Sequence, residues 1–547
     1  MSESQSFIQK LKGRAADLAA GAIFRVSTSN WNLAIPVVLF LLVGRCAFQK
    51  PETFSGPVTV DFAMPSEKAV PKYEPAGKID QNDIRWRFRY AETGTEFRAG
   101  VPYWIFRIMP RLMPEQFGGR GYDWFGFDDE DQEFYESTPV PRGLALSDST
   151  LRIPFLNVRF NLKRVSVNCS GCHRGQLIDE SGKRRLIDGM PNHTANLQAF
   201  KRFYASAFQD PRFEGGNVVA AIDQALAEDK KPPLTKKEQL IYRALVEVLR
   251  GYTRERGSAW MDSRPDNGPG RIDPFNAVKF EVLKVPDDGT APTLDFPAVW
   301  NQRAEMRLWH HYDGNTKDSS ARNFGSAIGV GGIAWSVYKH SVSKIGDWLD
   351  ILPPPKYPFA APDPAQVAQG LELFKTRCAA CHGLYDREKN RIDTASSPNY
   401  MQINSEIGTD PERWKAFPTA AAGALNRFGF EHGLWPRDAF RGSTNGYLCG
   451  PLDGIWARAP YLHNGSVPNL NELLKPPEQR PKRFYRGNPR YDAVNMGWVH
   501  TDGARKDNGL PLFEYDTSLV GNSNQGHPIA IEDDAERAAV LAYLKTL

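Results

Sequence analysis

Hydrophobic residues recur at helical spacing in four parts of the chain, and prolines interrupt this pattern. Near the C-terminus the spacing predicts one helix that begins at Asp363-Pro364 and runs to residue 378, and a closing helix over 533–547. Further upstream it predicts helices over 195–208 and 217–256, the second broken at Pro232-Pro233. The segment Asp179-Glu-Ser-Gly182 is typical of a hairpin turn. We therefore expect a mainly α fold with long loops and little β-structure.

Two proline-rich segments divide the chain. Residues 49–84 are polar and rich in proline, which is typical of a linker. The stretch 352–364 contains too many prolines for the interior of a helix or strand. The predicted organisation is a stub and anchor over 1–48, a linker over 49–84, a larger domain over 85–352 and a compact domain over 363–547.

A continuous apolar stretch, residues 33–44, lies close to the N-terminus. Basic residues precede it, and no small-x-small cleavage site follows, because Arg45 and Cys46 come next. This arrangement predicts an uncleaved signal anchor that leaves the bulk of the chain on the periplasmic side of a bacterial inner membrane. Twelve apolar residues are short for a membrane span, so export followed by signal cleavage is the alternative.

The composition of the chain is that of an ordinary folded protein. The 547 residues carry a net charge of +4 and a charged fraction of 24%, and this charge is too small to indicate a nucleic-acid partner. Six cysteines are too few for a disulfide scaffold in a chain of this length.

Four of the cysteines belong to two Cys-x-x-Cys-His motifs, Cys169-Ser-Gly-Cys172-His173 and Cys378-Ala-Ala-Cys381-His382. This spacing is the attachment signature of c-type haem, in which two thiols bond the haem vinyl groups and the histidine becomes an axial iron ligand. A pair of redox or zinc motifs is the alternative. We expect two covalently bound c-type haems, one in each large domain, forming two cytochrome c-like units.

The chemistry of each haem depends on the ligand opposite His173 or His382. A haem with two strong protein ligands transfers electrons, whereas one with an open face can react with dioxygen or peroxide. His527, in the glycine-flanked loop Gly521–His527, is the best histidine candidate for the second iron, and Met401 and Met496 are rivals. A faint internal repeat, Trp309–Asn315 and Tyr461–Ser466, indicates that one cytochrome unit has been duplicated.

Five segments carry a resemblance to a known family. The chain resembles the di-haem rubber oxygenases of the RoxA type over about residues 84–547, and its second half is shared more loosely with di-haem peroxidases and MauG. The segments are Gly100–Glu115, Val165–His173, Trp309–Asn323, Ala459–Pro468 and Asp516–His527.

The resemblance implies that His527 is the sixth ligand of the second haem. It also implies that the first haem, on His173, binds dioxygen beside a distal phenylalanine, for which Phe296 is the candidate. Trp300 is the accompanying catalytic candidate. Trp300, Trp309, Trp335 and Trp348 lie between the motifs and are candidates for relaying electrons or for packing in the core.

Three departures separate the chain from these families. Residues 312–332 contain neither the Glu nor the Gln found in the peroxidases. Because cleavage of peroxide needs an acid–base group, this difference makes a peroxidase function less favoured. His310 and His311 are not required in such oxygenases, and either would close the first site if it reached the iron. The characterised oxygenase type is secreted, whereas an anchor is predicted here.

Three functions stay open at this point. The first is an oxygenase that inserts both atoms of dioxygen across a carbon–carbon double bond of an apolar, isoprenoid-like substrate. The second is a peroxidase or MauG-like oxidase that receives electrons from a small cytochrome or other redox donor through the second haem. The third is an electron carrier without enzymatic activity, in which both haems are six-coordinate.

Overall fold

The computed structural model describes residues 81–547, except 129–139, 148–149, 154–157, 256–258, 303–308, 335, 387–390, 394–396 and 502–511. The predicted anchor, most of the predicted linker and Trp335 lie outside the described residues. Among the helices of the described part, none has the length and apolar character needed to cross a bilayer.

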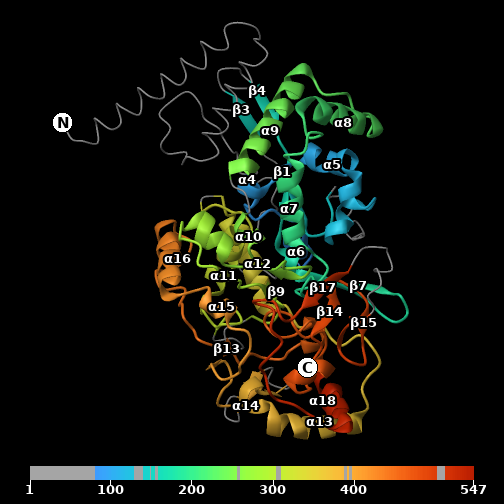
Figure 1. Ribbon diagram of the computed structural model, residues 1–547, viewed down its shortest axis with the longest axis vertical. Coiled ribbons are helices and arrows are strands. Elements are labelled where there is room, and N and C mark those ends of the chain that lie inside the picture. The colour runs from blue at the N-terminus through green and yellow to red at the C-terminus, as the bar shows by residue number, and fades with distance from the viewer. Residues whose placement is uncertain are drawn as a thin grey trace, which may run out of the picture.

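Helices form most of the regular structure and are distributed along the whole long axis (Figure 1). The α-helices are α3 (Gln81–Tyr90), α4 (Glu96–Ala99), α5 (Tyr103–Leu112), α6 (Cys169–His173), α7 (Leu197–Ala207), α8 (Gly215–Glu228), α9 (Lys236–Glu255), α10 (Ala259–Asp262), α11 (Ser319–Gly329), α12 (Lys339–Ile351), α13 (Pro364–Arg377), α14 (Ala379–His382), α15 (Glu412–Lys415), α16 (Thr419–Glu431), α17 (Leu470–Leu473) and α18 (Asp534–Leu544). Short 3-10 or π turns cover Pro114–Phe117, Gly121–Phe125, Ala277–Val282, Ile455–Arg458 and Pro477–Gln479.

The strands are short and pair two at a time, apart from one three-stranded sheet in the order β1-β5-β2. The antiparallel pairs are β3–β4, β6–β7, β8–β9, β10–β11, β12–β13, β14–β17 and β15–β16. Their bounds are β1 (Val101–Pro102), β2 (Leu144–Ser147), β3 (Thr150–Ile153), β4 (Val158–Asn161), β5 (Arg164–Val167), β6 (Arg174–Ile178), β7 (Arg184–Asp188), β8 (Arg271–Ile272), β9 (Leu294–Asp295), β10 (Leu384–Asp386), β11 (Arg391–Asp393), β12 (Ile403–Asn404), β13 (Tyr447–Leu448), β14 (Arg483–Arg486), β15 (Tyr491–Asp492), β16 (Gly497–Trp498) and β17 (Phe513–Asp516).

The helices that the sequence predicts are present close to their expected positions. α7 corresponds to 195–208, and the expected break at Pro232-Pro233 separates α8 from α9. Asp179–Gly182 joins the paired strands β6 and β7, as expected of a hairpin. The structure contains more short strands than the sequence predicted. They were not predicted because strands of two to five residues are too short to show an alternating pattern.

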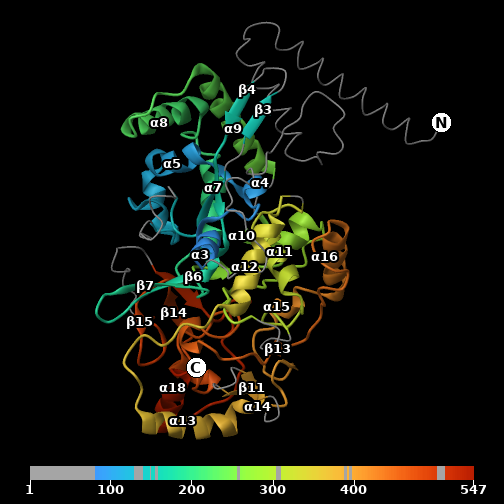
Figure 2. The same ribbon diagram turned by 180° about the vertical axis from the view of Figure 1, so that it is seen from behind.

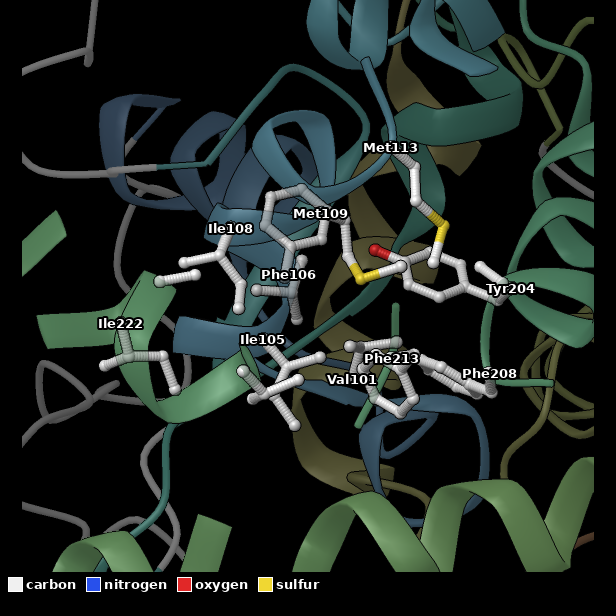
Figure 3. Close-up of a cluster of buried hydrophobic side chains, with 14 of the residues drawn as sticks. Val101, Ile105, Phe106, Ile108, Met109, Met113, Tyr204, Phe208, Phe213 and Ile222 are labelled. Carbon is white, nitrogen blue, oxygen red and sulfur yellow. The ribbon is translucent and has the colours of Figure 1, made fainter. Parts of the chain in front are cut away.

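One large core fills the end of the molecule that holds α5, α7, α8 and α9. Figure 3 shows the side chains of Met109, on α5, and Met113, the residue that follows α5, facing Tyr204 of α7. Two hydroxyls of this cluster, those of Tyr122 and Tyr204, are 2.7 Å apart, and Tyr122 also donates to the carbonyl of Phe106. Burial of each large apolar side chain stabilises the fold by about 1.5–3 kcal/mol. This core therefore gives the first motif a rigid support.

The opposite end is built from α13 and α18, which lie side by side in both views (Figures 1 and 2). Gly370 makes this close crossing possible, because a Cβ atom there would lie 1.9 Å from the carbonyl oxygen of Ala539. Asp363 caps α13 by accepting hydrogen bonds from the backbone amides of Ala365 and Gln366. α13 leads directly into Cys378, so this helix pair positions the second motif.

The internal repeat seen in the sequence has a definite register in the structure. His310 and Thr316 form an isolated antiparallel bridge, and so do Tyr461 and Val467. Both loops turn at a glycine in the left-handed region, Gly314 in one and Gly465 in the other. Such matching of bridge, turn and backbone conformation is expected if one cytochrome unit was duplicated.

The two halves share a core rather than packing as separate bodies. Leu177 and Trp300 of the first half belong to the same hydrophobic cluster as Phe374 and Trp456 of the second. The connection over 352–364 contributes to this cluster through Leu352, Tyr357 and Phe359. The two motifs are therefore held at fixed positions relative to one another.

Candidate haem centres

The first motif forms the short helix α6. Asn168 precedes it, and its side chain accepts a hydrogen bond from the backbone amide of Ser170 at 3.1 Å. Nδ1 of His173 lies 3.0 Å from the carbonyl oxygen of Pro297. A carbonyl can only accept, so Nδ1 carries the proton and Nε2 keeps its lone pair for a metal. Burial lowers the pKa of His173 to about 4, which keeps the ring neutral.

The second motif repeats this arrangement. Cys378 ends α13, and Cys381 and His382 follow on α14. Nδ1 of His382 lies 2.9 Å from the carbonyl oxygen of Gly450, so its Nε2 also carries the lone pair. Burial lowers the pKa of His382 as well. Both histidines are thus fixed from behind by a backbone carbonyl in the tautomer that a metal ligand requires.

His527 lies opposite His382, with the ring centres 6.3 Å apart. An imidazole–metal bond is about 2.0–2.1 Å long and a ring nitrogen lies about 1.1 Å from the ring centre, so two imidazoles in line on one metal have centres roughly 6 Å apart. Nδ1 of His527 is buried without a hydrogen-bond partner among the described residues. Burial, and next the neighbouring His382, lowers the pKa of His527 to about 3. This neutral pair fits a single iron between its rings.

Arg480 holds the His527 loop in place. Its guanidinium donates hydrogen bonds to the carbonyl oxygens of Asn524, Gly526 and His527 at 2.8–2.9 Å and to that of Leu473 at 3.1 Å. His527 itself has a φ of +48°, a left-handed conformation that costs a non-glycine residue energy unless its surroundings enforce it. Arg480 supplies that enforcement.

If His527 binds a haem iron, we expect Arg480→Met to weaken that bond by about 10- to 100-fold, as loss of an outer-sphere partner does at other metal sites. The EPR spectrum of the ferric holoprotein is expected to show a mixture of low-spin and high-spin iron at the second haem. Arg483→Met is the matched control, because Arg483 is 66% exposed and forms only surface ion pairs. Identical spectra for both variants would contradict this role of Arg480.

A cavity of about 600 Å³ connects the two centres. Its lining includes His173, His382 and His527, the four motif cysteines and many apolar side chains. Burial raises the pKa of the Cys169 and Cys378 thiols to about 11 and that of Cys172 to about 12. The raised pKa values argue against redox-active thiols, which need thiolates. The described residues contain no group of three or more His, Cys, Asp or Glu side chains that could hold a metal ion, which argues against a zinc site, so haem attachment is favoured over both alternatives.

The cavity also offers a partner for the anionic edge of a porphyrin. Arg413 lines it, is 2% exposed and forms an ion pair with Asp313 at 2.8 Å. Its Nη1 atom has no partner among the described residues. A carboxylate substituent on a bound porphyrin would satisfy that nitrogen. The residues present therefore fit a covalently attached haem.

The other candidate residues occupy different places. Phe296 is 2% exposed and lines the cavity. Trp300 is completely buried, donates its indole N–H to the carbonyl of Asp453 at 3.0 Å and packs in the shared core, outside the cavity lining found for the described residues. Met401 lines the cavity, whereas Met496 packs in the shared core.

The remaining tryptophans and the paired histidines are also placed. Trp309 lines the cavity with the Arg441 guanidinium 3.5 Å from its ring centre, and Trp348 packs against Phe88. His310 and His311 both line the cavity.

Several residues of the site escaped the sequence analysis. Pro297 and Gly450 act through their backbone carbonyls, which cannot be recognised from the identity of a side chain. Arg480 is one of 68 Lys and Arg residues, and its neighbours in the sequence do not distinguish it from the others. Cys449, left over from the motifs, is buried next to Cys381, whose proximity contributes after burial to raising the pKa of Cys449 to about 12. The Asp-Gly-Asn turn that contains Asp313 was visible in the sequence, but its partner Arg413 was not.

Comparison with known proteins gives two family matches. A family described as RoxA-like, cytochrome c-like, matches residues 446–485, and a family described as a Y4iN-like domain matches residues 85–173. The first segment contains Gly450 and Arg480, which fix His382 and the His527 loop. The chain thus contains a RoxA-like cytochrome c domain, and such a domain implies a c-type haem.

Two proteins of Sinorhizobium fredii (strain NBRC 101917 / NGR234) are similar to the chain. It is 28% identical to the uncharacterized protein y4iJ over 587 aligned residues, which cover 87% of the chain and 95% of that protein. It is 32% identical to the uncharacterized protein y4iM over 294 residues, which cover 49% of the chain and 64% of that protein.

Proposed function

We propose that the protein is a di-haem c-type cytochrome that acts outside the cytoplasm as an oxygenase on an apolar, isoprenoid-like substrate. Cys169, Cys172 and His173 would hold the haem at which oxidation takes place. Cys378 and Cys381 would hold the second haem, with His382 and His527 as its two axial ligands. The RoxA-like cytochrome c domain at 446–485 supports this assignment.

The second centre is suited to electron transfer. The 6.3 Å between the ring centres of His382 and His527 leaves room for one iron and no exogenous ligand. Neutral, buried imidazoles on both sides favour a low-spin iron that changes its oxidation state without a change of ligands. The same role would allow this haem to tune or restore the first one, since an oxygenase of this kind consumes no net electrons.

The first centre has the surroundings of an oxidation site for an apolar compound. Among the described residues of the cavity lining there is no glutamate, and the one aspartate, Asp273, is occupied by hydrogen bonds from the amides of Phe275 and Asn276 and from the Asn276 side chain. Residues 312–332 likewise contain no glutamate or glutamine. Among the described residues, the lining therefore offers no free carboxyl group for peroxide cleavage, and this observation favours an oxygenase over a peroxidase.

A c-type haem supplies, when bound, a redox-active iron that transfers electrons when six-coordinate and can activate dioxygen where one position is open. The chain contributes the surroundings. Pro297 orients His173, the apolar walls around Phe296 exclude water and favour a hydrocarbon, and Arg413 holds an anionic substituent. In the proposed reaction both atoms of dioxygen enter the substrate, and a carbon–carbon double bond is cleaved to two carbonyl groups.

The location and partners belong to the same proposal. Covalent haem attachment takes place outside the cytoplasm, and the apolar stretch 33–44 would anchor the protein to the periplasmic side of the inner membrane. Dioxygen is the proposed co-substrate, and a small cytochrome is the proposed redox partner of the second haem.

The experiment that tests the function uses the full-length holoprotein with squalene dispersed in detergent and ¹⁸O₂. Incorporation of ¹⁸O into carbonyl products, and its loss in the Cys169→Ala/Cys172→Ala variant, are expected. Turnover of hydrogen peroxide with a reduced cytochrome, without oxygen incorporation, would replace the oxygenase with a peroxidase. Failure of both reactions would leave an electron carrier.

A further inference from the structure

A buried ion pair joins the strand beside the first centre to the second half of the chain. The carboxylate of Asp295, at the end of β9, binds the guanidinium of Arg486, at the end of β14, and both side chains are 1% exposed. The backbone amide of Asp295 also donates to the carbonyl of His463 at 2.9 Å. Desolvation offsets most of the attraction within a buried pair, so this one is explained better by the geometry that it fixes than by stability.

The residues that directly follow Asp295 build the first centre. The side chain of Phe296 lines the cavity, and its backbone amide donates to the carbonyl of Gly270 at 2.9 Å. Pro297 supplies the carbonyl oxygen that lies 3.0 Å from Nδ1 of His173. Because Asp295 and Pro297 are only two residues apart, a movement of Asp295 would shift the carbonyl that orients His173.

Arg486 is held as firmly as the carboxylate that it binds. Its guanidinium also donates to the carbonyl oxygens of Gly465 at 2.6 Å and of Pro269 at 3.1 Å. Two glycines leave room for it, since a Cβ atom at Gly465 would lie 2.3 Å from its Nη1 and one at Gly270 would lie 3.0 Å from its Nη2. Backbone carbonyls and this reserved space therefore fix the guanidinium, and Asp295 with it.

A second buried arginine, Arg271, lies directly opposite Asp295 in the β8–β9 pair. Its guanidinium donates to Oδ1 of Asn522 at 2.8 Å and to the carbonyl of Asn267 at 3.2 Å, whereas Arg486 binds the carboxylate. Burial raises the pKa of Asp295 to about 6, against the opposing effect of Arg486. The carboxylate is therefore ionised at neutral pH, and the pair is intact.

We infer that Asp295 and Arg486 are positioning residues of the first haem centre, because their ion pair holds the Pro297 carbonyl against Nδ1 of His173. The inference rests on the proposed function only in requiring a c-type haem at Cys169–His173. It means that strand β14 of the second half fixes the iron ligand of the first half.

The reduction potential of the first haem reports this positioning. A hydrogen-bond acceptor at Nδ1 of a ligating histidine makes the imidazole more basic. A more basic imidazole favours ferric iron, so loosening of the bond between Pro297 and His173 raises the potential. A role confined to general stability would not move the potential of one haem and leave the other unchanged.

The test is an optical redox titration of the full-length holoprotein and of Asp295→Asn. Two one-electron waves are expected. In the variant the wave of the first haem is expected to move upward, with the ferrous-to-ferric ratio at a fixed potential rising about tenfold, which corresponds to about 59 mV. The wave with the low-spin spectrum of the His382–His527 centre is expected to stay in place.

A second variant keeps the inference testable if Asp295→Asn does not fold, since that change leaves Arg486 as an unpaired buried charge. Asp295→Asn/Arg486→Gln removes both charges and keeps the net charge of the site. It is expected to give the same upward shift, because the cause is the position of the Pro297 carbonyl and not the lost charge.

Glu514→Gln is the matched control on the same pair of strands. Glu514 lies on β17, pairs with Arg483 of β14 at 3.4 Å and is 50% exposed, so its loss is expected to move neither wave. An equal shift of both waves, or no upward shift in the double variant, would overturn the inference.

Haem counting separates the two ideas. Absence of haem from the first motif of the wild type ends the proposed function itself. A first haem that is present, but whose wave the double variant does not move, overturns only the role of the ion pair and leaves the oxygenase standing.

Discussion

Replacing His527 with alanine is expected to convert the second haem from low-spin to high-spin iron. The imidazole of His527 is the group opposite His382, and removal of a ligand leaves the iron with one axial protein bond. Haem content should not change, because on the proposed assignment Cys378 and Cys381 would still hold the porphyrin covalently. EPR at low temperature and the optical spectrum of the ferric protein measure the change.

Two controls make this result specific. His432→Ala removes an exposed histidine that bonds only the carbonyl of Phe428 and is expected to leave the spectrum unchanged. Free imidazole added to His527→Ala is expected to restore the low-spin signal, because the space left by the side chain faces the iron. If His527→Ala keeps the wild-type spectrum, Met401 becomes the candidate ligand, since it also lines the cavity.

Removal of either cysteine pair is expected to reduce the covalently bound haem to about half, since the di-haem proposal assigns one porphyrin to each Cys-x-x-Cys-His motif. Cys169→Ala/Cys172→Ala should retain the low-spin His382–His527 signal, and Cys378→Ala/Cys381→Ala should lose it. The variant without all four cysteines should show no haem stain on a denaturing gel. Mass spectrometry of the intact chain gives the number of attached porphyrins directly.

Cys449→Ser is the matched control for this series. Cys449 is buried beside Cys381 but lies outside the motif, so its loss should leave haem content unchanged. A wild-type chain with one porphyrin, or a cysteine pair whose removal leaves the haem content intact, would contradict the di-haem proposal.

Local features of the sequence predicted the parts of the fold that depend on neighbouring residues. The start of α13 was visible because Asp363-Pro364 is a capping pattern followed by apolar residues at helical spacing, and the break between α8 and α9 because proline cannot continue a helix. The short strand pairs were not visible, because their pairing is decided by contacts between distant segments. β14 and β17, for example, join Arg483–Arg486 to Phe513–Asp516.

The sequence alone determined the attachment chemistry, since two thiols and an imidazole at fixed spacing bring all the reacting groups together within five residues. Only the tertiary structure decided which groups stand behind and opposite those imidazoles. Pro297 and Gly450 act through backbone carbonyls, which every residue possesses, and His527 lies 145 positions beyond His382.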